Sequence, residues 1–369
     1  MTAHHSVTHG LWSQHGQPAL AFECEYIHPA LERRRKVGSL RKLSPYHQEN
    51  TIDFSSNDYL GLAVSKEQNA LVEETYKKLA HHSLGATGSR LLTGDSDYAQ
   101  TLERRLAKWH KRPAALLCNS GYDANLSVLS SLTMNCVVLL DELCHSSIHM
   151  GVRLSKGCNV CTFLHNSIND LRRILREKTR ADSSTRILIV VESVYSMDGD
   201  QSPLRGILET AAEFNACVIV DEAHGLGVLG EEGMGLLSQD GLENHPALLC
   251  SVHTFGKAAG CHGAVICGSS AIREYLYNYG RPIVYSTSLP LHSLVAIACA
   301  YRTMSSGKGR LLRARVAERV ERFRNNMRKI LLARDGSISL APSESPIQAL
   351  ILPGNAVCID FCSIMSQKS

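Results

Sequence analysis

One lysine, Lys257, lies among small and weakly polar residues in the stretch SVHTFGKAAGCHGAV (251–265). No Asp, Glu or Arg occurs within ten residues of it on either side. One interpretation is a surface lysine at the end of a strand, with its ammonium group in water. The other is a lysine kept partly dry, which lowers its pKa and allows the amine to attack a carbonyl group. The surroundings of the lysine must distinguish the two.

Short apolar runs alternate with helix-like segments through the middle of the chain. The runs are PAALLC (113–118), NCVVLL (135–140), RILIVV (186–191), ACVIV (216–220), ALLCSV (247–252) and GAVICG (263–268). Most of them are apolar on both faces, which is typical of buried parallel strands. The βαβα order therefore predicts an α/β domain with a mostly parallel sheet, whose ligand site lies beyond the carboxyl ends of the strands.

Polar and ionisable side chains follow five of the apolar runs. They lie at Asn119–Tyr122, Asp141–His145, Glu192–Ser196, Asp221–His224 and His253–Lys257. A carboxylate such as Asp221 can hold a protonated ring nitrogen, and Lys257 can bind an aldehyde covalently. A helix that begins near Ser120 can bind phosphate through its backbone N–H groups. Together these groups predict a site for pyridoxal 5′-phosphate (PLP).

Three other motifs carry less weight. Asp221–His224 spells DEAH, which is typical of helicases, but the sequence lacks the phosphate loop G-x-x-x-x-G-K-[ST] that such enzymes need. Gly225–Gly230 matches the dinucleotide pattern G-x-G-x-x-G, yet the four residues DEAH, three of them ionisable, separate it from the preceding apolar run. Cys158 and Cys161 form a C-x-x-C pair without a second ligand pair, so we expect no metal site.

The composition is that of an ordinary soluble protein. The 369 residues are 44% hydrophobic and carry a net charge of only +4, and no stretch reaches 18 apolar residues. We therefore expect neither nucleic acid nor a membrane as a partner. Thirteen scattered cysteines and the absence of a secretory signal favour a reducing compartment. The expected location is the cytoplasm, or the peroxisome if a C-terminal signal was lost.

Eight ordered motifs resemble the α-oxoamine synthases, which are PLP enzymes of the aspartate-aminotransferase fold (fold type I). The motifs are SNDYLGL (56–62), GATGSRLLTG (85–94), SGYDAN (120–125), DELCHSSIHMGVRL (141–154), ESVYSMDGD (192–200), DEAHGLGVLG (221–230), TFGK (254–257) and YSTSLP (285–290). The chain is most similar to members that condense L-alanine with pimeloyl-CoA in biotin biosynthesis, releasing CoA and CO2. Two alternatives stay open: a glycine C-acetyltransferase, and an inactive structural partner.

The resemblance implies a role for each residue around the cofactor ring. Lys257 would bind the aldehyde of PLP and later move the Cα proton of the amino acid. Asp221 would pair with the pyridinium nitrogen, and His145 would stack on the ring and assist decarboxylation. His224 and Ser196 would hydrogen-bond the phenolic oxygen.

Further residues are implied at the edges of the site. The phosphate would be held by Gly121, Tyr122 and Thr254. Members of the family are homodimers with shared active sites, so the partner subunit is expected to contribute Asn57, Ser286 and Thr287. Arg33, in the segment LERRR, is the candidate contact to the acyl thioester.

We expect three parts along the chain. They are an N-terminal arm (1–55), a large PLP-binding α/β domain (56–290) and a small C-terminal α/β domain (291–369). The family carries a carboxylate-binding arginine near its C-terminus, and no arginine follows Arg334 here. The small domain is therefore expected to be truncated. Loss of this clamp is expected to weaken binding of the amino acid.

Overall fold

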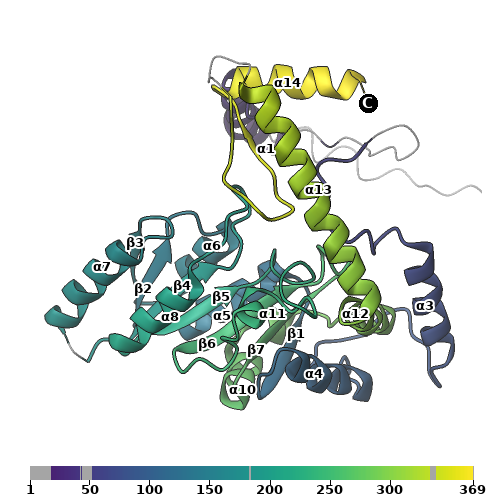
Figure 1. Ribbon diagram of the computed structural model, residues 1–369. Coiled ribbons are helices and arrows are strands. Elements are labelled where there is room, and N and C mark those ends of the chain that lie inside the picture. Colours follow the sequence, from purple (N-terminus) through teal and green to yellow (C-terminus); the bar gives the residue numbers. More distant parts are fainter. Residues whose placement is uncertain (1–17, 42, 44–51, 183, 333–337, 369) are drawn as a thin grey trace, which may run out of the picture. The chain divides into compact units, whose positions relative to one another are not determined.

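The computed structural model describes residues 18–41, 43, 52–182, 184–332 and 338–368. The chain divides into two compact units, and the larger one spans residues 55–350 (Figure 1). The described helices of the smaller unit are α1 (Pro18–Phe22), the π-helix η1 (Glu23–Ile27), α2 (His28–Lys36) and α14 (Asn355–Lys368). The predicted boundaries of the three parts stay a prediction.

A seven-stranded sheet forms the centre of the larger unit, in the order β1-β7-β6-β5-β4-β2-β3. Its strands are β1 (Ala114–Cys118), β2 (Val137–Asp141), β3 (Asn159–Phe163), β4 (Ile187–Glu192), β5 (Cys217–Asp221), β6 (Leu248–Thr254) and β7 (Ala264–Gly268). Only β7 runs antiparallel to its neighbours, β1 and β6. The predicted mostly parallel sheet is confirmed. All six apolar runs form strands, whereas β3 was missed because this edge strand is largely exposed.

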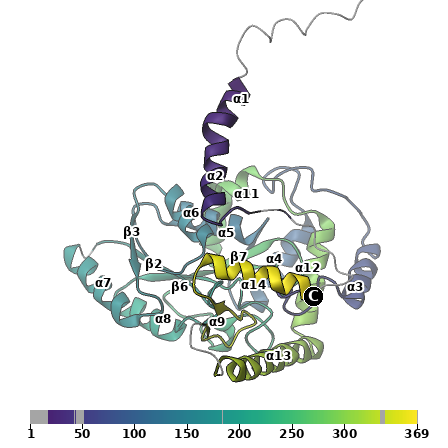
Figure 2. The same cartoon turned by 90° about the horizontal axis from the view of Figure 1, so that it is seen from above.

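Helices cover both faces of the sheet (Figures 1 and 2). The described helices of the larger unit are α3 (Lys66–Lys77), α4 (Asp97–Trp109), α5 (Gly121–Leu132), α6 (Ser146–Leu154), α7 (Ile168–Ala181), α8 (Leu204–Glu213), α9 (Leu236–Gln239), α10 (Ser270–Tyr279), α11 (Arg281–Tyr285), α12 (Leu291–Met304) and α13 (Gly307–Leu332). Serine side chains accept a first-turn N–H at the starts of α3, α4, α5, α7 and α10, which explains where these helices begin.

Strand β2 shows how the apolar runs build the core. Val137 and Leu139 pack in a cluster with α7 and α8, whereas Val138 and Leu140 pack in a second cluster with α5 and α6. Successive side chains of a strand point to opposite faces, so a strand buried on both faces must be apolar at every position. Burial on both faces therefore accounts for the continuous apolar runs.

Helix α12, which follows residue 290, packs on the large sheet. Leu294, Ile297 and Tyr301 of α12 belong to one core cluster with α4, β1 and β7. A short pair of strands follows, β8 (Ser339–Leu340) and β9 (Leu350–Ile351). Ser343, between them, donates a hydrogen bond of 2.8 Å to the carbonyl oxygen of Gly199. The connection between these strands is thereby tied to the loop that follows β4.

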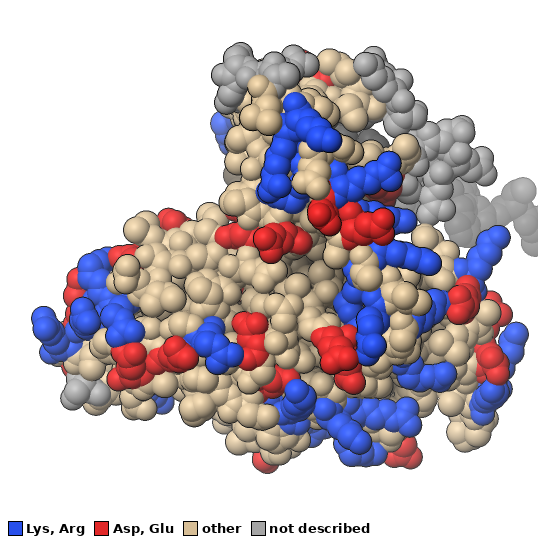
Figure 3. Space-filling view, in the orientation of Figure 1, with Lys and Arg blue, Asp and Glu red and all other residues tan. Residues whose placement is uncertain are grey.

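The distribution of charged side chains on the surface is consistent with the small net charge. On the face drawn in Figure 3, basic and acidic side chains are interspersed among uncharged ones. Among the described residues, no helix combines the length and hydropathy that a membrane span requires.

Candidate active site

Five strand ends meet at one edge of the sheet. Strands β2, β4, β5 and β6 are parallel, and β1 has the same direction because β7 is antiparallel to both β1 and β6. Asp221, the last residue of β5, lies opposite Glu192 in the register with β4. Lys257 lies three residues after the end of β6, and His145 lies four residues after the end of β2. The edge therefore gathers two acids, a lysine and two histidines, counting His224.

The Asp221 carboxylate is buried and held from both sides. Its Oδ1 accepts a hydrogen bond of 2.8 Å from the backbone N–H of Ala223. Its Oδ2 accepts one of 2.7 Å from the side chain of Asn125, which also donates to Ser147 Oγ at 2.9 Å. These bonds fix the orientation of the carboxylate at the base of the site. Asn125 and Ser147 are supporting residues that the sequence did not single out.

Lys257 and His224 face each other. The lysine Nζ lies 2.6 Å from His224 Nε2. Burial lowers the pKa of Lys257, against the opposing influence of the carboxylates of Asp221 and Glu192. Burial, with smaller contributions from Lys257 and His145, lowers the pKa of His224 to about 3, so its imidazole is neutral at pH 7. Of the two interpretations of the lysine, the structure supports the partly dry amine.

The SNDYLGL segment adds two further side chains behind His224. The Tyr59 hydroxyl lies 2.7 Å from His224 Nδ1 and donates a hydrogen bond of 3.1 Å to Asn57 Oδ1. Asp58 holds the turn by accepting hydrogen bonds from the backbone N–H groups of residues 62 and 63. Asn57 is therefore linked to Lys257 of its own chain, whereas the resemblance implies that it reaches the partner's site. Tyr59 was missed because a tyrosine in a loop shows no chemical pattern.

His145 stands at the start of α6 with its ring exposed. Its backbone N–H donates to Glu192 Oε1 at 2.6 Å, and its Nδ1 lies 2.7 Å from Ser147 Oγ. Partial burial lowers the pKa of His145, with Asp221 acting to raise it and Lys257 to lower it. Burial and the nearby Asp221 raise the pKa of Glu192 to about 8. An oriented ring with a free face suits stacking on a flat ligand.

The start of α5 lies against the end of β6. A Cβ atom added to Gly121 would lie 3.1 Å from the Cβ of Thr254, so a larger side chain here would push the two segments apart. Ser120 caps the helix by accepting from Asp123 N. Tyr122, the next residue of the helix, is exposed. The positive end of α5 is thus beside the loop that carries Lys257, which suits an anion.

The remaining predicted residues are placed as follows. Asn119 Nδ2 donates a hydrogen bond of 2.8 Å to the backbone oxygen of Thr287, so Ser286 and Thr287 lie at the end of β1. They line a pocket together with Asn119 and Asp123. Ser196 is half-buried in the loop after β4. Arg33 lies in α2, in the smaller unit, so its contact with a thioester stays a prediction.

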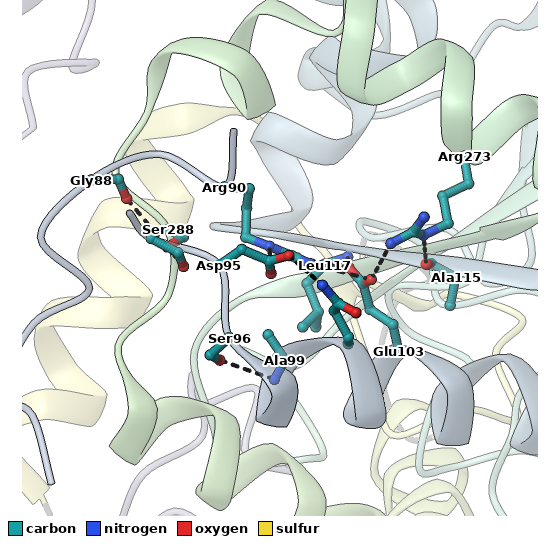
Figure 4. A network of polar contacts seen from close by, with 12 residues as sticks. Gly88, Arg90, Asp95, Ser96, Ala99, Glu103, Ala115, Leu117, Arg273 and Ser288 are labelled. Atoms are coloured by element: carbon teal, nitrogen blue, oxygen red, sulfur yellow. Dashed lines mark hydrogen bonds and ion pairs between the residues drawn. The ribbon is translucent and has the colours of Figure 1, made fainter. Parts of the chain in front are cut away.

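A network of charges supports the GATGSRLLTG loop (Figure 4). Glu103, buried on α4, accepts from Arg90 at 2.7 Å, from Arg273 at 2.8 Å and from the backbone N–H of Leu117 at 2.9 Å. Arg90 also pairs with Asp95 at 2.5 Å. The loop is therefore anchored to α4 and β1, and Ser288 bonds to the same loop at Gly88.

These residues fit PLP. The buried carboxylate, the partly dry amine, the exposed imidazole face and the close approach at Gly121 are the groups that a pyridinium, an aldehyde, an aromatic ring and a phosphate require. The roles of the single residues stay predictions.

One group of metal-ligand types lies elsewhere, in the core. The potential ligand atoms of His110, His253 and Cys267 are all within 4.8 Å of one another. However, the two imidazoles stack at 3.8 Å, and their Nε2 atoms lie 2.8 and 2.9 Å from the hydroxyls of Tyr301 and Ser251. These nitrogens already have partners in the core, and the prediction about metals stays a prediction.

Residues 49–368 match the aminotransferase class I and II family. An 8-amino-7-oxononanoate synthase from Emericella nidulans is 38% identical over 312 residues, which cover 82% of this chain and 75% of the relative. The solved 8-amino-7-oxononanoate synthase of Francisella tularensis matches with a TM-score of 0.68 at 26% identity, covering 87% of each chain. Serine palmitoyltransferase from Sphingomonas wittichii matches with a TM-score of 0.74 at 26% identity, covering 88% of this chain and 81% of the other.

Proposed function

The chain belongs to the aminotransferase class I and II family, and we propose that it is a PLP-dependent 8-amino-7-oxononanoate synthase of biotin biosynthesis. The reaction condenses L-alanine with pimeloyl-CoA and releases CoA and CO2. The proposal is carried by one observation: the buried Asp221 carboxylate, the exposed His145 ring and the Lys257 amine meet at the strand ends of a fold shared with the solved synthase. The predicted fold class is the one that the comparisons show.

When bound, PLP supplies an electron sink for the negative charge that develops at Cα of the amino acid. Asp221, held by Asn125 and Ala223, would keep the ring nitrogen protonated, and this keeps the sink effective. Lys257 would hold the cofactor aldehyde and then remove the Cα proton of alanine. The lowered pKa of Lys257 favours the neutral amine that both tasks require.

The other residues bind and orient. His224, neutral and 2.6 Å from the lysine, would hydrogen-bond the phenolic oxygen together with Ser196. His145 would cover one face of the ring, with its backbone fixed by Glu192. Gly121 and Thr254 would admit the phosphate to the start of α5, with Tyr122 beside it.

We further propose a homodimer in the cytoplasm. The support for a dimer is the anchored segment that contains Ser286 and Thr287, which the resemblance assigns, together with Asn57, to a shared site. The support for the location is the composition alone.

The test is the visible spectrum of the full chain with PLP, recorded alone and then with L-alanine, glycine or L-serine. We expect a band from lysine-bound PLP that is absent in Lys257→Ala and shifts with L-alanine more than with the other two amino acids. Addition of pimeloyl-CoA to the protein with L-alanine should then release CoA. A folded protein that forms no band would refute the cofactor assignment. A band that responds to glycine with acetyl-CoA instead would favour a C-acetyltransferase.

A further inference from the structure

Four side chains form an unbroken chain of hydrogen bonds from the half-buried Lys257 to the surface. Lys257 Nζ lies 2.6 Å from His224 Nε2, and His224 Nδ1 lies 2.7 Å from the Tyr59 hydroxyl. The same hydroxyl donates to Asn57 Oδ1 at 3.1 Å. His224 is buried, Tyr59 is half-buried and Asn57 is exposed. We call these four residues the lysine relay.

The donors and acceptors of the relay leave one consistent direction when Lys257 is charged. An ammonium group only donates, so His224 Nε2 must accept. A neutral imidazole then carries its proton on Nδ1 and donates it to the Tyr59 oxygen. The Tyr59 proton must therefore point to the carbonyl oxygen of Asn57, which can only accept. Each of the three contacts in the relay then pairs one proton with one acceptor.

We propose that Asn57 is a positioning residue that acts through Tyr59 to set the tautomer of His224. By accepting the Tyr59 proton, Asn57 keeps the lone pair of His224 Nε2 turned toward Lys257 and so favours the ammonium form of the lysine. The proposal rests on the proposed function only in taking Lys257 as the site of cofactor attachment.

The relay also provides a route by which Lys257 becomes a nucleophile. The lysine proton passes to His224 Nε2, the Nδ1 proton passes to the Tyr59 oxygen, and the original Tyr59 proton leaves to bulk water beside the exposed Asn57. The products are a neutral amine, a neutral imidazole protonated on Nε2 and an intact phenol. Burial raises the pKa of Tyr59 above its ordinary value, so no phenolate needs to accumulate.

Other charged groups also act on Lys257 or His224, and they lie at or just after strand ends rather than in the SNDYLGL segment. Asp221 and Glu192 favour the ammonium form, and burial opposes it. His145 contributes to the environment of His224. The exposed Asn57 can be replaced without disturbing these groups, so a change in the lysine pKa reports on the relay.

Two substitutions should act in opposite directions. Asn57→Asp provides a charged acceptor for the Tyr59 proton and should raise the apparent pKa of Lys257 by about 1 unit. Asn57→Leu removes the acceptor, which frees the Tyr59 proton for His224 Nδ1, and should lower that pKa by about half a unit. In a Tyr59→Phe background, the difference in the apparent pKa of Lys257 between the two Asn57 variants should fall to less than about a third of its value with Tyr59 present. Tyr98→Phe removes a hydroxyl from a tyrosine packed on the same core cluster and should change nothing.

The readout is the pH dependence of the rate at which Lys257 captures PLP, followed by absorbance without any amino acid substrate. An apparent pKa that is the same in wild type, Asn57→Asp and Asn57→Leu would overturn the proposal. So would an unchanged difference between the two Asn57 variants in the Tyr59→Phe background.

A second readout does not need the cofactor. ¹⁵N NMR of the histidine-labelled chain, with His224 assigned from a His224→Gln variant, should show the proton on Nδ1 in the wild type and a shift toward Nε2 in Asn57→Leu. The opposite tautomer in the wild type would overturn the relay. If PLP is never captured, the proposed function fails, and the relay is still decided by this spectrum.

Discussion

Replacing Glu103 by glutamine is expected to lower the free energy of unfolding by about 3 kcal/mol. Glu103 is 3% exposed, and its main partner Arg90 has a side chain that is only 12% exposed. Glutamine can still accept from the N–H of Leu117, but it leaves the guanidinium of Arg90 without its buried countercharge. Breaking a buried ion pair costs about 3–5 kcal/mol, and the remaining partner Asp95 places this case at the lower end.

Arg273 should add little to this loss, because its side chain is 33% exposed and water can solvate it. Glu103→Ala should cost about 1–3 kcal/mol more than Glu103→Gln, because it also leaves the backbone N–H of Leu117 without a partner. Replacing both Glu103 and Arg90 by methionine should recover part of the stability, since no buried charge then remains.

Urea denaturation of the full chain measures these differences. The matched control is Glu213→Gln, which breaks another two-bond pair, with Arg172, where the Glu213 side chain is 50% exposed. That change should cost much less than Glu103→Gln, because water solvates both partners of the exposed pair. The reasoning is refuted if Glu103→Gln costs no more than Glu213→Gln, because burial would then not decide the value of the ion pair.

Three further changes test the site and its supports. Gly121→Val should weaken PLP binding about tenfold or more in a fluorescence titration, because the added Cβ would crowd Thr254. Gly85→Val is the control: a Cβ at Gly85 has no atom within 4 Å, so this variant should bind PLP as the wild type does. Burial and Asp221 raise the pKa of Glu192 to about 8, so the stability that Glu192 contributes is complete below about pH 4.5 and is lost as the pH rises toward 8. In thermal melts, the stability of Glu192→Gln relative to the wild type should therefore increase over that range. A stability difference that does not change with pH would contradict the raised pKa. Burial lowers the pKa of His165, but hydrogen bonds to Asp141 and Asp200 raise it more, so the stability that His165 contributes is present below about pH 6.5 and is lost above its raised pKa. His165→Gln should therefore lose more stability at about pH 5.5 than at about pH 8.5. Equal losses at the two pH values would exclude a charged His165.

The apolar runs and the polar groups that follow them were sufficient to predict the sheet and the edge that carries the site. Burial on both faces requires apolar residues at every position, so β2, β4 and β5 could be recognised from local sequence. Parallel strands end at the same edge, so Asp221 and Lys257 could be expected to meet there although 36 residues separate them. The edge strand β3 was not predicted, because it is largely exposed and therefore does not need an apolar residue at every position.

The partners of the site residues were decided by the tertiary structure alone. Glu192 lies beside Asp221 only because β4 and β5 are neighbours in the sheet, and strand order is not encoded in the apolar period. Tyr59 meets His224 across 165 residues because a turn held by Asp58 carries it there. The sequence by itself determined which chemical groups stand at the strand ends. The fold decided their hydrogen-bond partners, their burial and therefore their protonation, because these depend on contacts between segments far apart in the chain.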